Sequence, residues 1–285
     1  MIKIRIMMKK IFTLTAAVVS LLFVSCEKQA IGYLSDDIDV TKFAQIRFVN
    51  DLPIVPTGTT YNITRLKYND AMVSEVSTSL GGIIPNSVAK YHVVPIGPLK
   101  IDAFVSSTKD VLQYTNTINI PAGRWSAFVH NVAEAPFMVE TPSQFPSMDP
   151  WKDTVCTIQF VNLLYKADGT PYSGKLFLKG RRGSAAPYTY VDIAQCGFKE
   201  ASNFIKYKLY RTATVWSGDE GGLAFVLFDE AGNLLKDFST GTTVRDYSAT
   251  GFTLSKGRHY IFHLNGKLGT SATNQSIRMS TITLI

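Results

Sequence analysis

Short alternations of apolar and polar residues recur along the chain, and clusters of Gly, Pro, Asn and Asp separate them. In residues 44–48, for example, Ala44, Ile46 and Phe48 alternate with Gln45 and Arg47. A period of two is typical of a β-strand that buries one face and exposes the other. Outside the first 25 residues, no long stretch has the 3.6-residue period of an amphipathic helix. The pattern therefore predicts an all-β protein.

An internal repeat indicates that one β unit occurs twice. The motif Ile-x-Phe-Val-Asn-x-Leu is found at 46–52 and again at 158–164. Between and after these motifs, three further pairs correspond: Lys90-Tyr91 with Lys206-Tyr207, Phe128 with Phe262, and Asn131 with Asn265. Self-similarity of this kind predicts two copies of the same structural unit.

Each copy has about seven short strands with turn signals every 8–12 residues, as immunoglobulin-like sandwiches do. In the second copy Cys156, Ile158 and Phe160 take the inward positions. We predict two tandem immunoglobulin-like (Greek-key) β-sandwich domains, at residues 43–141 and 153–285. The proline-rich segment 142–152 between them is expected to act as a semi-rigid spacer.

The N-terminal segment has the order of a secretory signal: cations, then an apolar run over 11–24, then Ser25-Cys26. The run is shorter than the roughly 20 apolar residues of a membrane-spanning helix. We expect a signal peptide at 1–25, lipid attachment at Cys26, and a solvated tether over 26–42. We expect the protein to be held at the outer membrane by this lipid. Both the periplasmic and the surface-exposed face of that membrane agree with the sequence.

The net charge of the chain becomes small once the signal is removed. The whole chain has 29 Lys+Arg against 22 Asp+Glu, a net charge of +7. Four of those cations and none of the anions lie in the signal, so 25 cations against 22 anions leave +3. No zinc-finger or basic-helix pattern is present either, and we expect no nucleic-acid partner.

Three motifs carry a resemblance to a known family: Ile-x-Phe-Val-Asn, the stretch 91–97, and Ala122-Gly123-Arg124. They resemble a secreted β-sandwich repeat, of a domain family of unknown function, in lipoproteins of the Bacteroides group. The likeness covers most of 43–140 and less of 153–285. It implies a fold and a cell-envelope location, with no catalytic residues. A more distant resemblance is to fimbrillin-type lipoproteins, which have two tandem sandwiches.

The cysteines, histidines and paired carboxylates do not form a recognisable catalytic or metal-binding motif. In an exported protein Cys156 and Cys196 could form a disulfide or remain two buried thiols. His259 and His263 lie four residues apart on a predicted strand, about 13 Å, which is too far for one metal ion. Paired carboxylates at 219–220 and 229–230 lie in predicted turns, and no nucleophile elbow is present. We therefore expect no enzyme, no metal and no cofactor.

Two features point toward partners. The segment Gly180-Arg181-Arg182-Gly183 is either a basic turn that contacts acidic glycans or a solvated hairpin loop. Trp151 and Trp216 are the tryptophans expected to be exposed and able to stack on sugars, whereas Trp125 is expected in the core.

The resulting hypothesis is a non-catalytic binding or structural module for glycans or an outer-membrane protein. The alternative is a fimbrial or accessory pilus subunit that assembles by strand exchange. The final residues 279–285 read as a strand that completes its own domain, which favours the first hypothesis.

Overall fold

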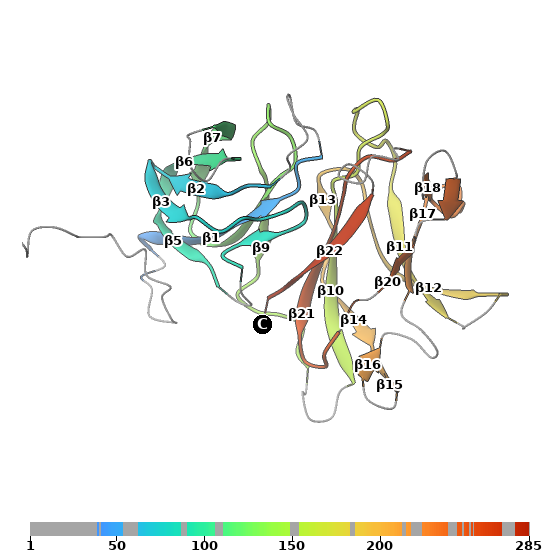
Figure 1. Cartoon of the computed structure of the whole chain (residues 1–285). Coiled ribbons are helices and arrows are strands. Elements are labelled where there is room, and N and C mark those ends of the chain that lie inside the picture. Colours follow the sequence, from blue (N-terminus) through green and yellow to red (C-terminus); the bar gives the residue numbers. More distant parts are fainter. Residues whose placement is uncertain are drawn as a thin grey trace, which may run out of the picture. The chain divides into compact units, whose positions relative to one another are not determined.

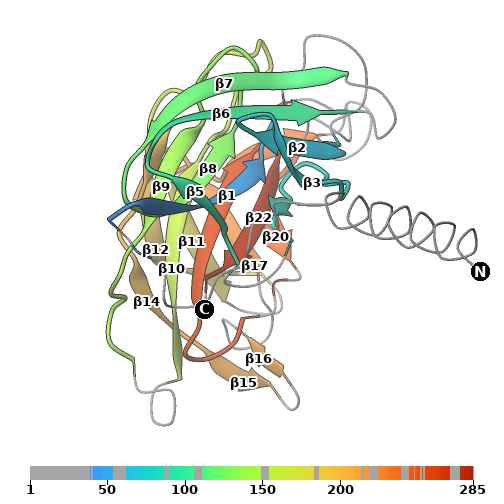
Figure 2. The same ribbon diagram turned by 90° about the vertical axis from the view of Figure 1, so that its left-hand side faces the viewer.

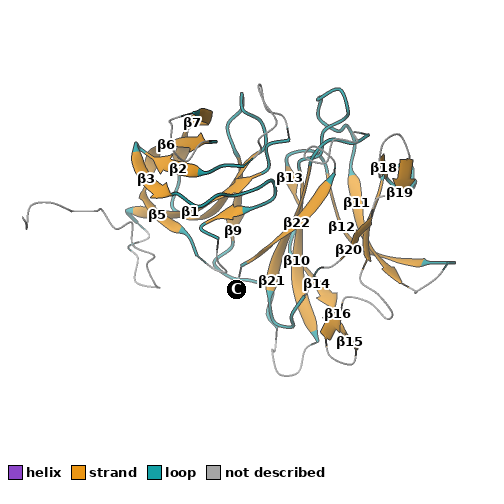
Figure 3. Ribbon diagram, viewed as in Figure 1, coloured by secondary structure: helices purple, strands orange, loops and turns teal. Residues whose placement is uncertain are grey.

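In the computed structural model, the parts that can be described are all-β. These residues are 39, 41–53, 62–86, 90–105, 111–148, 154–182, 186–212, 215–217, 224–238, 244–246, 248–250, 252, 254–269 and 277–284. They contain strands and loops and no helix (Figure 3), so the predicted fold class is confirmed. Among them, no helix is long and apolar enough to cross a bilayer. The signal, Cys26 and most of the tether lie outside the described residues.

The first sandwich contains β1 to β9 (Figure 1). Sheet 1a has the order β4 (Ile83–Ile84), β1 (Phe43–Asn50), β8 (Gly123–Val129) and β9 (Phe137–Thr141), and β5 (His92–Pro95) also pairs with β1. Sheet 1b has the order β3 (Ala71–Ser74), β2 (Arg65–Tyr68), β6 (Gly97–Phe104) and β7 (Leu112–Ile120). One buried apolar cluster draws residues from both sheets, so they form the two layers of a sandwich.

The second sandwich contains β10 to β22. Sheet 2a has the order β13 (Glu200–Ala201), β10 (Val155–Asn162), β21 (His259–Asn265) and β22 (Arg278–Thr283), and β14 (Ile205–Lys208) also pairs with β10. Sheet 2b has the order β12 (Thr189–Cys196), β11 (Leu176–Arg182), β17 (Ala224–Phe228) and β20 (Ser248–Thr250). Two hairpins complete it: β15 (Tyr210–Thr212) with β16 (Val215–Ser217), and β18 (Lys236–Phe238) with β19 (Val244–Asp246).

Sheets 1a and 2a share one topology. In each, the opening strand pairs in parallel with a late strand, β1 with β8 and β10 with β21, and antiparallel with two shorter strands. The inward residues of both opening strands lie in the cores as predicted: Ala44, Ile46, Phe48, Cys156, Ile158 and Phe160. The repeated sequence motif therefore corresponds to a repeated strand arrangement.

All three predicted correspondences within the repeat are wrong, and Asn131 is shifted by one residue from Asn265 in the same way as Phe128 from Phe262. Asn50 pairs with Val129 and Asn162 with Leu264, so Phe128 matches His263 rather than Phe262. Phe128 accordingly points out of its sandwich, whereas Phe262 points into the core. This is the change of face that a shift of one residue causes in a strand. Likewise, His92 occupies the position of Ile205, so Tyr91 and Tyr207 do not correspond.

The outer faces of sheets 1a and 2a are also buried, which the alternating pattern did not predict. A third apolar cluster joins them: Val49, Phe128 and Val139 from the first sandwich, with Val161, Leu163, Ile261, Ile282 and Leu284 from the second. Arg47, expected to face solvent, is completely buried, and its guanidinium carbon lies 4.0 Å from the centre of the Tyr91 ring. β10 and β21 are buried on both faces along nearly their whole length, although polar residues such as Gln159 and His263 occupy outer positions.

Polar contacts also connect the two sandwiches. Asp51 accepts hydrogen bonds from His263 and Asn265, and the ring nitrogen Nδ1 of His130 lies 2.6 Å from the hydroxyl of Tyr165. Lys199 forms an ion pair with Glu134. Within the predicted spacer 142–152, Phe145 stacks on His259 with ring centres 3.8 Å apart, so part of this segment packs on the second sandwich.

Cys156 and Cys196 are both buried free thiols. Cys156 lies in sheet 2a and Cys196 in sheet 2b, on opposite sides of the second core. The sulfur of Cys196 lies 3.5 Å from the carbonyl of Phe160, which is four residues along β10 from Cys156. Four strand residues span about 13 Å, well beyond the ~4.4–6.8 Å between Cα atoms that a disulfide requires.

Candidate functional site

The outer face of sheet 2b gathers cations and aromatic rings. Strand alternation and the β11–β12 and β11–β17 registers place six side chains on or beside this face: Phe177, Lys179, Arg181, Tyr190, Asp192 and Phe228. Their neighbours along these strands, such as Leu178 and Phe225, point into the core instead. We call this set, together with Tyr188, the cation–aromatic face.

Close contacts order this face. The guanidinium carbon of Arg181 lies 4.5 Å from the centre of the Tyr188 ring, and Nζ of Lys179 lies 4.9 Å from that of Phe228. Tyr190 meets Phe228 edge to face, with ring centres 5.0 Å apart. These geometries are those of cation–π and aromatic pairs, which fix side chains that would otherwise move freely.

The charges on this face are unevenly paired. Lys179 forms a 2.9 Å ion pair with Asp192, whose side chain is largely exposed. Arg181, in contrast, has no acidic partner within the part of the chain that the structure describes. Tyr190 is one of the few large hydrophobic side chains that are exposed, at 39%. The face thus presents the exposed ring of Tyr190 beside the guanidinium of Arg181.

The sequence predicted this region only in part. Arg181 and Arg182 belong to β11 and are paired with β12, so they are not the tip of a hairpin turn. Trp216 lies in β16, outside sheet 2b, and Trp151 falls outside the described residues. Trp125 is partly buried against the first core. Tyr188 and Tyr190 were missed because an exposed tyrosine in a strand looks like an ordinary β-forming residue.

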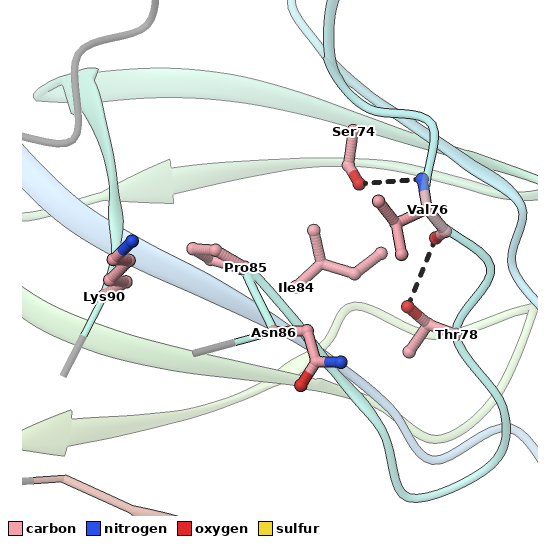
Figure 4. A pocket seen from close by; sticks show the side chains of 7 residues that line it. All are labelled: Ser74, Val76, Thr78, Ile84, Pro85, Asn86 and Lys90. Atoms are coloured by element: carbon pink, nitrogen blue, oxygen red, sulfur yellow. Dashed lines mark hydrogen bonds between the residues drawn. The ribbon is translucent and has the colours of Figure 1, made fainter. Parts of the chain in front are cut away.

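A cleft of about 340 Å³ lies at the edge of the first sandwich (Figure 4). Seven residues line it: Ser74, Val76 and Thr78 at and after the end of β3, Ile84, Pro85 and Asn86 at and after the end of β4, and Lys90 before β5. Val76, Ile84 and Pro85 supply apolar surface, and the other four supply hydroxyl, amide and ammonium groups. The volume is at the low end for a small-molecule site, and no aromatic ring lines the cleft.

The histidines lie apart from both sites. His263 and His130 make the inter-sandwich contacts described above, and Nδ1 of His259 lies 2.7 Å from the Thr157 hydroxyl. Burial lowers the pKa of both His92 and His130 to about 4. Within the described ranges, no group of three His, Cys, Asp or Glu side chains is arranged to hold a metal ion.

Comparison with known proteins does not identify a family for this chain. No protein-family model and no curated protein matches this chain. One solved structure, described as a "putative cell adhesion protein" from Bacteroides uniformis, is 8% identical, with a TM-score of 0.23. That match covers 85% of this chain and 96% of the other. A likeness at this level carries no argument about function, which must come from the residues themselves.

Proposed function

We propose that this chain is a non-catalytic cell-envelope lipoprotein that binds glycans through the cation–aromatic face. The observation that carries the proposal is the position of Tyr190, exposed on β12 and directly opposite Arg181 on β11. A pyranose ring has one apolar face of C–H groups, which suits an aromatic ring, and an edge of hydroxyls that needs hydrogen-bond partners. Arg181 and Asp192 supply a donor and an acceptor beside the ring.

The charge of the face indicates which glycans it should prefer. Lys179 forms an ion pair with Asp192, whereas no acidic side chain among the described residues pairs with Arg181, whose guanidinium is a planar set of donors. Guanidinium groups bind carboxylate and sulfate groups through two parallel hydrogen bonds. We therefore expect acidic sugars to bind more tightly than neutral ones of the same size.

The test is a binding titration of the full chain against matched acidic and neutral oligosaccharides, monitored by calorimetry. Tyr190→Ala and Arg181→Ala should each weaken binding at least tenfold, because each removes a central contact. Tyr190→Phe should bind nearly as well as the wild type, since it keeps the ring. Lys206→Ala changes an exposed residue of β14, in sheet 2a, and is the matched surface control.

Two results would contradict this assignment. If Tyr190→Ala binds normally while Asn86→Ala does not, the cleft of the first sandwich is the site. If no oligosaccharide binds and the chain instead co-purifies with a membrane protein, the partner is a protein.

The strand-exchange alternative has no specific observation in its favour. A donor strand would have to leave its own sheet, but β22 pairs along its length with β21. Ile282 and Leu284 at this end of the chain are buried in the cluster between the sandwiches. Membrane attachment through Cys26 remains a prediction, and mass spectrometry of the N-terminal peptide would test it.

A further inference from the structure

β7 is an edge strand whose regular part, residues 114–120, follows a β-bulge at Gln113. At nine residues, Leu112–Ile120, it is longer than any other described strand, and among the described strands it pairs with β6 alone (Figure 2). It contains no charged residue and no proline. The other edges are short or carry a charge: β12 has Asp192, β9 has Glu140, and β22 has Arg278. Natural proteins normally use such charges to prevent pairing between edges.

The sequence of β7 is nearly symmetric about its centre. Reading outward from Asn116, threonine meets threonine (115 and 117), Tyr114 meets Ile118, Gln113 meets Asn119, and Leu112 meets Ile120. An antiparallel pair of two such strands about Asn116 would place like beside like over residues 114–118. The β-bulge at Gln113 takes residues 112 and 113 out of this register. A two-fold axis requires that kind of self-complementary surface, because the same patch contributes both halves.

The two faces of β7 agree with this symmetry. On one face Tyr114 and Ile120 are buried and Ile118 is partly buried, whereas Thr115, Thr117 and Asn119 on the other face are exposed. Pairing about Asn116 keeps each residue on its own face, so the apolar row of one copy continues into that of the other.

We propose that two copies of this chain associate edge to edge, through antiparallel pairing of β7 with β7 about Asn116. The two four-stranded sheets then form one continuous eight-stranded sheet. A single pair of strands buries less surface than the roughly 1,600 Å² of a standard interface. The dimer should therefore be weak and should appear only as the protein concentration rises.

Two double substitutions separate this arrangement from a general effect of charge. In the proposed register, residue 115 of one copy lies opposite residue 117 of the other. Thr115→Lys with Thr117→Lys therefore places like charges opposite each other twice, whereas Thr115→Lys with Thr117→Glu makes two attractive pairs. Within one chain, Asp102 lies opposite position 115 and Lys100 opposite position 117, so the second variant is also compatible with its own sheet.

The experiment is sedimentation equilibrium of the full chain in density-matched detergent, over a range of concentrations. We expect the wild type to dimerise reversibly, the Lys/Lys variant to stay monomeric, and the Lys/Glu variant to dimerise as well as the wild type or better. Thr189→Lys, at the exposed start of the β12 edge, should leave the dimer unchanged. Thermal unfolding of each variant shows that the sandwich itself remains folded.

Three results would overturn the proposal. The first is a wild-type protein that stays monomeric at every concentration. This result overturns the proposal even if the monomer binds unrelated extended peptides at β7. The second is a dimer that survives in the Lys/Lys variant, because its interface then lies elsewhere. The third is equal loss of the dimer in both double variants, which rules out the Asn116 register.

Discussion

His263 on β21 and Asp51, just after β1, lie 212 residues apart in the chain and meet in the buried region between the sandwiches. The ring nitrogen Nδ1 of His263 is 2.8 Å from Oδ2 of Asp51, and both side chains are fully buried. The other carboxylate oxygen accepts a hydrogen bond from the amide of Asn265. One carboxylate in the first sandwich thus satisfies two donors from the second, in a place that water does not reach.

Removal of this carboxylate should destabilise the whole protein. Asp51→Ala leaves the His263 and Asn265 donors buried and without their partner, at a cost of about 2–5 kcal/mol in the free energy of unfolding. Asp51→Asn keeps one acceptor and should cost less. Urea unfolding measures both, with Glu75→Ala at an exposed position as control. A loss for Asp51→Ala no larger than for the control would mean that the contact contributes nothing to stability.

Close approach of a loop to β22 makes any side chain at Gly81 costly. Gly81 has φ +80°, and a Cβ placed there would overlap Oγ of Ser280. Gly232 has nearly the same φ, +77°, but nothing lies within 4 Å of its added Cβ. Gly232→Ala therefore measures backbone strain alone, on the order of 1 kcal/mol. Gly81→Ala should cost clearly more in urea unfolding, and Ser280→Gly should restore part of the difference. Equal losses at the two glycines would contradict the close approach.

Acid should weaken the fold well above the pKa range of carboxylates. Burial holds the pKa of His92 and His130 at about 4, whereas an unfolded histidine titrates near 6.5. Between these pH values the unfolded state binds more protons, so the free energy of unfolding falls as pH falls. Each histidine can contribute up to about 3 kcal/mol to this loss.

Urea unfolding at several pH values between 7 and 4.5 checks this dependence. His92→Phe keeps an aromatic ring beside Tyr68, with which His92 makes an edge contact, and it should flatten the pH profile. A profile that is equally steep with and without the histidine would show that other groups are responsible.

The sequence predicted the sandwiches but not the contact between them, and particular residues show why. Ala44, Ile46 and Phe48 alternate with polar neighbours, so the period of two located the inward face of β1 correctly. The same period wrongly predicted that Arg47 is exposed, because a strand pattern cannot reveal that a second sheet covers the outer face of the strand. The apolar residues at outer positions, Val49 and Val161, were the available signal.

The sequence alignment of the two repeats was wrong where similar residue types suggested a match that the strand register does not have. Phe128 and Phe262 look equivalent, yet they point to opposite faces of their sheets because the true register differs by one residue. The candidate glycan site was predicted only through Arg181, since Tyr188, Tyr190 and Phe228 come together through strand pairing that no local pattern encodes.

The two cysteines should be inert in the folded protein. Burial raises the pKa of both Cys156 and Cys196 to about 12, so neither forms a thiolate at neutral pH. Alkylation with iodoacetamide should modify neither thiol in buffer and both in concentrated urea without reductant. Mass spectrometry counts the modified residues. If both stay unmodified in urea until a reductant is added, the cysteines are bridged and the separation across the core is wrong.

Arg47 is the least expected side chain in the interface between the sandwiches, and its replacement should stabilise the protein. Its guanidinium is fully buried, and among the described residues only the Tyr91 side chain compensates its polar nitrogens. Burial lowers its pKa, and the Tyr91 ring is its principal compensation. Replacement of a buried charge by an apolar side chain of similar length is often neutral or stabilising, by about 1–4 kcal/mol.

We therefore expect Arg47→Met to raise the midpoint of urea unfolding without a change in its slope. Arg47→Lys should lower the midpoint, because an ammonium is more strongly hydrated than a guanidinium and stacks less well on Tyr91. If Arg47→Met is destabilising by several kcal/mol instead, the guanidinium must have a strong partner in the native protein. In that case the interface between the sandwiches holds an anion or ordered water that Arg47 binds.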